Sequence, residues 1–136
     1  MRKQLQPLGI IALGGVLGAE ARYGIDHLAA GSASAVPWAT LTVNVAGCLL
    51  IGVLMVVLLE LTAPHRLLRP FLGIGVLGGF TTFSAYAVEV QVLLDDGRGL
   101  VALVYLAATP VLAVAFCWAG AALARTVFNH RRGGHR

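Results

Sequence analysis

Charged residues are scarce in this chain. Asp, Glu, Lys and Arg together make up 12% of its 136 residues, whereas 58% are hydrophobic and the mean hydropathy is +0.84. In a soluble globular domain about a quarter of all residues are charged, so this composition excludes that class and indicates an integral membrane protein. The apolar runs are continuous, which argues against a membrane β-barrel built from alternating segments of roughly 10 residues.

Cysteine is scarce as well. The two cysteines, Cys48 and Cys117, fall in apolar runs without metal-ligand spacing, so we interpret them as small packing residues. No Ser/His/Asp or Cys/His set can be assembled at membrane depth, which leaves enzymatic chemistry without a candidate constellation. We therefore expect a protein that is not an enzyme and has no organic cofactor.

Long hydrophobic runs dominate the rest of the chain. A bilayer core about 30 Å thick is crossed by roughly 20 apolar residues in a helix. We therefore predict an all-α integral membrane protein, a single four-helix domain over residues 1–136. The transmembrane helices are expected at about residues 5–29, 37–61, 67–94 and 100–127.

The basic residues are distributed unevenly around these segments. Four helices would place eight of the ten on one side of the membrane: Arg2, Lys3, Arg66, Arg69, Arg125, Arg131, Arg132 and Arg136. The other side holds Arg22 and Arg98, together with Asp26, Asp95 and Asp96. By the positive-inside rule, both termini are predicted to face the cytoplasm. The net charge of +4 thus follows from topology and gives no reason to expect nucleic-acid binding.

A small and polar stripe runs along the second segment. Thr40, Asn44, Gly47 and Cys48 are spaced i, i+4, i+7 and i+8, which places them on one helix face. The stripe has two interpretations. It is either a packing face, on which Asn44 bonds to a neighbouring helix, or a pore wall, on which the amide donates to a passing ion.

Glycines repeat at helical spacing in two segments. Gly14 and Gly18 form one G-x-x-x-G pair, and Gly75 and Gly79 form another. Such pairs allow helix backbones to approach closely in membranes. We interpret both as packing or dimerisation motifs rather than ligand contacts.

A few polar residues lie within or near the other apolar runs. Arg22 and Glu89 are the charged residues nearest the membrane interior, and we expect them to face protein or water, or to lie near the interface. Tyr105 and Thr109 share one helix face just before Pro110. Their hydroxyl groups would either continue a polar track or serve packing.

The third segment is unusual at residues 78–86, which read GGFTTFSAY. Adjacent glycines followed by two threonines weaken a helix. A helix broken in mid-membrane offers free carbonyl groups to a cation and its new N-terminus to an anion. Aromatic ring edges are weakly electropositive, and they bind an anion loosely enough for conduction. An ordinary kinked helix is the alternative, but the run T-T-F-S favours an ion site.

Three motifs together resemble the Fluc/CrcB fluoride channels of bacteria: GAEARYG at 18–24, TLTVNVAGCLLIG at 40–52 and GGFTTFSAYAVE at 78–89. The resemblance covers nearly the whole chain. It implies an antiparallel dimer of four-helix subunits with a broken third helix, two fluoride pores and a central structural sodium ion. It also implies a multi-pass protein of the bacterial inner membrane that lets cytoplasmic fluoride leave passively and so relieves fluoride toxicity.

The resemblance also implies roles for particular residues. The fluoride pore would be lined by Asn44, Thr82, Phe83, Ser84, Tyr86 and Tyr105. The backbone carbonyls of Gly78 and Thr81 would bind sodium. Arg22 and Glu89 match an arginine and an acidic residue that the family carries near these motifs.

Two departures from the family stand out. Tyr86 occupies the place of a usual second phenylalanine, and Ala85 lacks a hydroxyl that the family commonly carries there. In addition, the biased loop charge differs from the near balance expected of a chain that inserts in both orientations. This bias suggests a heterodimer with an oppositely oriented homologue instead of a homodimer.

Two other functions compete with a channel. A small proton-coupled exporter of cations or drugs would need a carboxylate within the membrane, for which Glu20 and Glu89 are the candidates. A structural subunit of a larger membrane complex would leave the T-T-F-S run and Asn44 without a purpose.

Overall fold

The computed structural model describes residues 2–29, 36–61 and 66–133, and all regular structure in these ranges is helical. In chain order the elements are α1 (Arg2–Ala29), α2 (Trp38–Val56), η1 (Val57–Leu61), η2 (Pro70–Leu77), α3 (Gly78–Phe80), α4 (Ser84–Asp95) and α5 (Gly99–Gly133). The η elements are π-helical turns, wider than those of an α-helix.

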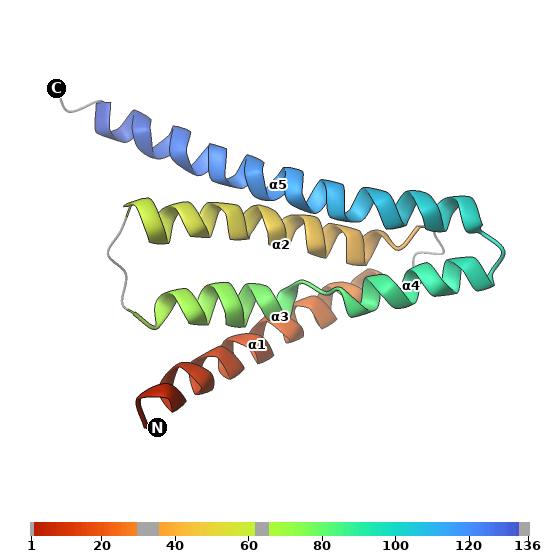
Figure 1. Ribbon diagram of the computed structural model, residues 1–136, viewed down its shortest axis with the longest axis horizontal. Coiled ribbons are helices and arrows are strands. Elements are labelled where there is room, and N and C mark those ends of the chain that lie inside the picture. The colour runs from red at the N-terminus through yellow and green to blue at the C-terminus, as the bar shows by residue number, and fades with distance from the viewer. Residues whose placement is uncertain (1, 30–35, 62–65, 134–136) are drawn as a thin grey trace.

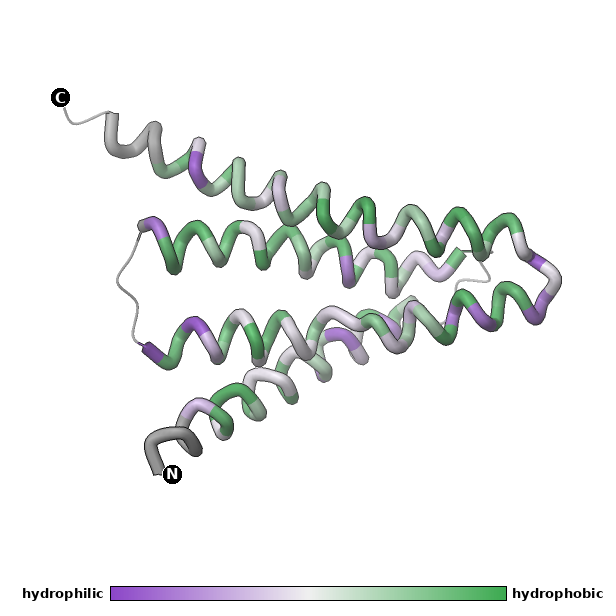
Figure 2. Tube along the Cα trace, in the orientation of Figure 1, coloured by the Kyte–Doolittle hydropathy of each residue, from purple (hydrophilic) through white to green (hydrophobic). Residues whose placement is uncertain are grey.

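The elements form four long passes through the bundle. Four helical stretches are long and apolar enough to cross a membrane: Pro7–Ala29, Trp38–Glu60, Pro70–Asp95 and Gly99–Phe128. This confirms the predicted all-helical chain with four candidate spans. The start of α1 and the end of α5 lie at the same end of the bundle (Figure 1). Hydrophobic residues cover most of each pass, and hydrophilic stretches gather toward the helix ends (Figure 2).

Glycines bring α1 against the first half of the third pass. A Cβ atom on Gly75 would lie 2.9 Å from Gly14 Cα and 2.9 Å from the carbonyl oxygen of Ile11. A Cβ on Gly79 would lie 2.9 Å from Gly15 Cα. Side chains cannot fit between backbones this close, so van der Waals contact between the helices depends on the glycines. The packing interpretation of the two G-x-x-x-G pairs is therefore confirmed by contacts within this chain.

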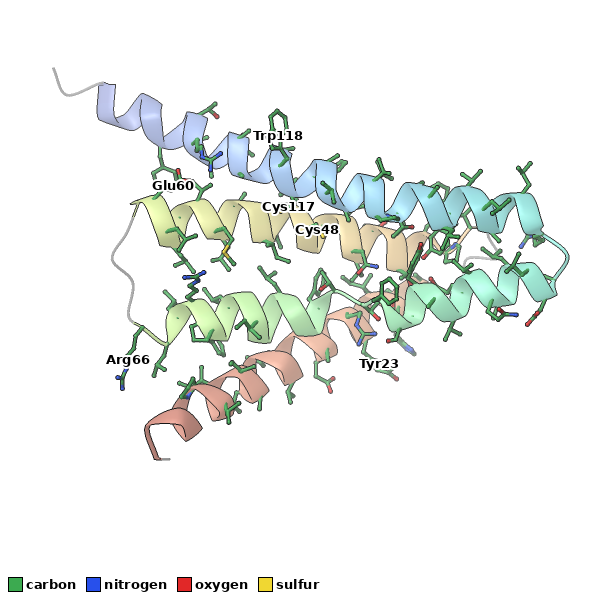
Figure 3. The ribbon with its side chains drawn as sticks, viewed as in Figure 1. Tyr23, Cys48, Glu60, Arg66, Cys117 and Trp118 are labelled. Atoms are coloured by element: carbon green, nitrogen blue, oxygen red, sulfur yellow. The ribbon has the colours of Figure 1, made fainter. Side chains whose placement is uncertain are left out.

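The other long contact joins α2 to α5. A Cβ on Gly52 would collide with the carbonyl oxygen of Cys117, and one on Gly120 with that of Leu49. Cys48 and Cys117 lie along this pair of helices as free, half-buried thiols (Figure 3), which agrees with their interpretation as packing residues.

Two features fix the ends of the bundle. Arg125 near the end of α5 donates hydrogen bonds of 2.7–3.2 Å to both carboxylate oxygens of Glu60 in η1. At the opposite end, Gly97 has φ +74° and allows the short turn from α4 to α5. In this turn the N–H of Gly97 donates to Leu94 and that of Arg98 to Leu93, the pair of bonds typical of a Schellman motif.

Candidate functional site

The helical run of the third pass is interrupted at Thr81–Phe83. Helix α3 ends at Phe80, Thr81 has extended backbone angles (φ −77°, ψ 153°), and α4 begins at Ser84. The Thr82 hydroxyl accepts a 3.1 Å hydrogen bond from the N–H of Ala85 in the first turn of α4. That bond satisfies one of the amide groups that a helix start leaves open.

Asn44 of α2 braces the interrupted backbone. Its Nδ2 donates to the Thr82 carbonyl at 2.8 Å, and its Oδ1 accepts from the Thr82 N–H, also at 2.8 Å. The amide is buried, with 7% of its residue surface exposed. Of the two interpretations of the α2 stripe, the bond to a neighbouring segment is therefore realised. An amide carries two N–H donors, and Thr82 takes one of them.

Because of these bonds, two backbone carbonyl groups lack the N–H donors that they would have in a continuous helix. In a continuous helix, Gly78 O would receive the N–H of Thr82, but that N–H goes to Asn44. Likewise, Thr81 O would receive the N–H of Ala85, which goes to the Thr82 hydroxyl. Gly78 and Thr81 are the two residues whose carbonyls the family resemblance implies as sodium ligands.

Arg22 of α1 lies close to α3, just before the interruption. Its Nε lies 3.5 Å from the Gly79 carbonyl oxygen, and its Nη1 lies 4.0 Å from the Asp26 carboxylate one turn further along. The expectation that Arg22 faces protein or water is consistent with these contacts.

Three aromatic rings follow one another from the interruption toward α5. The ring centroids of Phe83 and Tyr86 are 5.6 Å apart, and those of Tyr86 and Tyr105 are 5.4 Å apart, both pairs tilted. Tyr86 is 5% exposed, whereas Phe83 is 78% exposed. The Tyr86 hydroxyl donates to the Leu106 carbonyl oxygen at 2.6 Å.

Glu89, which is half-buried, forms a polar cluster with two buried hydroxyl groups beside these rings. Thr40 Oγ1 donates to one carboxylate oxygen at 2.6 Å, and the Tyr105 hydroxyl donates to the other at 2.7 Å. Thr40 and Tyr105 are 4% and 3% exposed. Sequence reasoning placed Tyr105 in a pore but did not join it to Thr40 and Glu89. The available signals were the spacing of Thr40 from Asn44 and of Glu89 from Tyr86, which places each pair on one helix face.

An open cavity of about 330 Å³, named the inner cavity, borders the interruption. It is lined by Asn44, Cys48, Thr81, Thr82, Phe83, Tyr86, Thr109, Pro110, Ala113 and Val114. Five residues predicted for the ion sites meet here: Asn44, Thr81, Thr82, Phe83 and Tyr86. The other three lie apart from it. The hydroxyl oxygen of Ser84 is 3.3 Å from that of Thr82, Tyr105 lies behind Tyr86, and Gly78 lies in α3.

A second cavity, of about 420 Å³, opens toward the α4–α5 turn. Its lining comprises Ala29, Val36, Pro37, Trp38, Ala39, Glu89, Val92, Leu93, Asp96 and Arg98. Glu89 thus borders this cavity, and its partner Tyr105 contacts Tyr86, which lines the cavity at the interruption. The described lining of the inner cavity offers hydroxyls, an amide and ring edges without a charged side chain, and such groups hold a small anion weakly.

Comparisons with known proteins agree on one family. Residues 9–121 match the family described as CrcB-like protein, Camphor Resistance (CrcB). The chain is 49% identical over 131 residues to Fluoride-specific ion channel FluC 1 of Streptomyces coelicolor, covering 96% of this chain and 85% of the relative. It is 53% identical over 115 residues to FluC 2 of Nocardia farcinica, covering 85% and 82%. It is 44% identical over 118 residues to FluC of Paracoccus denitrificans, covering 87% and 94%.

Proposed function

Since the chain belongs to the CrcB/FluC family of fluoride-specific ion channels, we propose that it is a passive fluoride channel that exports cytoplasmic fluoride and relieves its toxicity. The family is one of channels and not of enzymes. The observation that carries the proposal is the interrupted third pass, braced by Asn44 and bordered by ring edges and hydroxyls in an uncharged cavity. We take this interruption to lie in mid-membrane.

The fluoride path runs through the inner cavity in this proposal. Phe83 and Tyr86 offer ring edges, and Asn44 offers its second amide N–H. Thr82 and Ser84 contribute hydroxyls at the start of α4, and Tyr105 contributes to the path next to Glu89. None of these groups is a fixed cation, so an anion is held weakly enough to leave.

A structural sodium ion completes the proposal. Backbone carbonyls of interrupted membrane helices are suitable sodium ligands. Those of Gly78 and Thr81 fit this role, because their usual helical donors are given to Asn44 and to the Thr82 hydroxyl. The ion would supply positive charge that holds the interrupted backbone together.

The subunit is proposed to act as an antiparallel dimer in the bacterial inner membrane, with both termini of this chain in the cytoplasm. Two observations support a partner. Phe83 is 78% exposed, and the cavity beside it is open rather than enclosed. The charge bias of the loops favours an oppositely oriented homologue as that partner.

Fluoride efflux from liposomes tests the function. Vesicles with the purified chain, with and without a coexpressed homologue of reversed loop charge, are loaded with fluoride or with chloride as the control. We expect efflux of fluoride only, and we expect Phe83→Ile to abolish it. Phe116→Ile is the matched control, because Phe116 lies on α5 away from the cavity. Vesicles that release no fluoride even with the partner present would contradict the proposal.

The same vesicles test the partner. A heterodimer predicts weak efflux from the chain alone and strong efflux with the homologue. Strong efflux from the chain alone would overturn the heterodimer and leave the channel standing.

A proton-coupled exporter remains the second candidate, because Glu89 is a carboxylate within a candidate span. Both of its oxygens accept hydroxyl donors from the protein. Transport of an organic cation driven by a pH gradient, and lost in Glu89→Gln, would favour this function instead.

A further inference from the structure

The departure at Tyr86 has a counterpart on the neighbouring helix. In an α-helix, each carbonyl oxygen accepts the N–H of the residue four positions later. The residue four positions after Leu106 is Pro110, which has no N–H. The Leu106 carbonyl oxygen is the atom that accepts the Tyr86 hydroxyl at 2.6 Å.

The bond lies next to the proposed fluoride path, although Leu106 itself is not in the cavity lining. Tyr86 and Pro110 both line the inner cavity. A carbonyl oxygen carries partial negative charge. Without a hydrogen-bond donor to offset that charge, it repels an anion strongly in a setting of low dielectric. A bare oxygen at Leu106 would also leave an unsatisfied polar group within the membrane span.

The Tyr86 hydroxyl has a single proton. Because that proton is donated to Leu106, the hydroxyl is not a donor to fluoride in this arrangement. The ring remains between Phe83 and Tyr105, at centroid distances of 5.6 and 5.4 Å, and offers the same edge as a phenylalanine.

We propose, on the basis of the proposed fluoride path, that Tyr86 is a positioning residue paired with Pro110. Its hydroxyl donates a hydrogen bond to the Leu106 carbonyl, to which Pro110 has no N–H to donate. The bond fixes the Tyr86 ring against α5. The Tyr86 ring thus lies where a phenylalanine ring would lie, and its hydroxyl adds a hydrogen bond to Leu106 that compensates for the missing N–H of Pro110.

A double-mutant cycle between Tyr86→Phe and Pro110→Ala tests the pairing. With Pro110 present, Tyr86→Phe exposes the carbonyl, and we expect severalfold slower fluoride efflux and a lower thermal unfolding midpoint. In the Pro110→Ala background, the N–H of the new alanine donates to Leu106, so the same change is expected to cause a much smaller loss of both. Pro110→Ala thereby rescues the phenylalanine variant.

Tyr105→Phe is the matched control, because this tyrosine donates to Glu89 and not to the α5 backbone. Its effects should be equal with proline and with alanine at position 110. If Tyr86→Phe likewise causes equal losses in both backgrounds, or no loss in either, the pairing is overturned. The unfolding midpoints report on the pairing even in protein that passes no fluoride, so failure of the proposed function is distinguished from failure of this inference.

Discussion

The two halves of the third pass are held by opposite kinds of contact. Before the interruption, η2 and α3 lie against α1 through glycine backbones, with Gly75 against Gly14 and Gly79 against Gly15. After it, α4 is joined to α2 and α5 by buried hydroxyls and a carboxylate. The first half depends mainly on close backbone packing, with one long polar contact from Arg22 to the Gly79 carbonyl, and the second depends on satisfied polar groups.

The glycine-packed half therefore supports the fold, whereas the hydrogen-bonded half carries side chains proposed to line the fluoride path. Close backbone packing tolerates no added atom, but it presents few polar groups to an ion. The hydrogen-bonded half carries the side chains that contact the cavities, and each must keep its partner because unpaired polar groups are costly in lipid. Substitutions in the two halves should therefore fail in different ways.

Gly75→Leu should have the largest effect, since it breaks the glycine half. Its Cβ would lie 2.9 Å from two backbone atoms of α1, which cannot move aside as a side chain can. We expect destabilisation of more than about 3 kcal/mol, the upper end for overpacked sites, and loss of a single peak in size-exclusion chromatography. Gly9→Leu is the control, because no atom lies within 4 Å of a Cβ there. Equal unfolding midpoints for the two variants would contradict the glycine contact.

Asn44→Ala should come next, because it removes the brace between the halves. The N–H and C=O of Thr82 would both lose their partner. Each unsatisfied buried group costs about 1–3 kcal/mol, so for two groups we expect a loss of about 2–6 kcal/mol together with loss of fluoride efflux. The control is Gln91→Ala, whose amide makes an exposed bond to Asp95. A folded Asn44→Ala variant with normal efflux would refute the role of the brace.

Glu89→Gln should have a moderate effect, confined to the hydrogen-bonded half. The new amide NH₂ cannot accept a hydrogen bond, so either Thr40 or Tyr105 must turn its hydroxyl away. We expect a loss of about 1–2 kcal/mol in unfolding free energy and slower efflux. Glu60→Gln alters only an exposed pair with Arg125 and should leave efflux unchanged. Similar efflux in both variants would argue against a role for the cluster in conduction.

Gly97→Ala should have the smallest effect, because it lies outside both halves. Alanine at φ +74° is strained, and we expect a cost of about 1 kcal/mol with unchanged efflux. Gly99→Ala, at the first residue of α5, lacks that strain and has open space around its Cβ. If Gly97→Ala slowed efflux, the turn would have to be counted with the conduction path.

The sequence predicted the four helical spans because uncharged runs of bilayer length leave few other structures. It also predicted that the paired glycines pack, but not that Gly75 would meet Gly14, since a motif does not name its partner. The partner of Asn44 could not be foreseen for a related reason. Patterns identify side chains, whereas Asn44 and Tyr86 both bond to backbone atoms, those of Thr82 and Leu106.

The Glu89 cluster and the π-helical turns were not predicted. Glu89, Thr40 and Tyr105 come from three helices, and their meeting depends on how those helices are rotated. The π-helical turns of η1 and η2 have no marker in the sequence that we could identify. The assignments of individual residues to fluoride and sodium stay predictions, and the variants at Phe83 and Asn44 test the fluoride path.

The bond from Asn44 to Thr82 also has a consequence for how the protein is made. Alone in lipid, the third segment would expose the N–H and C=O of Thr82 without partners. The segment that carries Asn44 precedes the third segment in the chain, so its amide is synthesised before Thr82. We therefore expect the second and third segments to insert as a pair, with Asn44 supplying the partners that Thr82 needs in lipid.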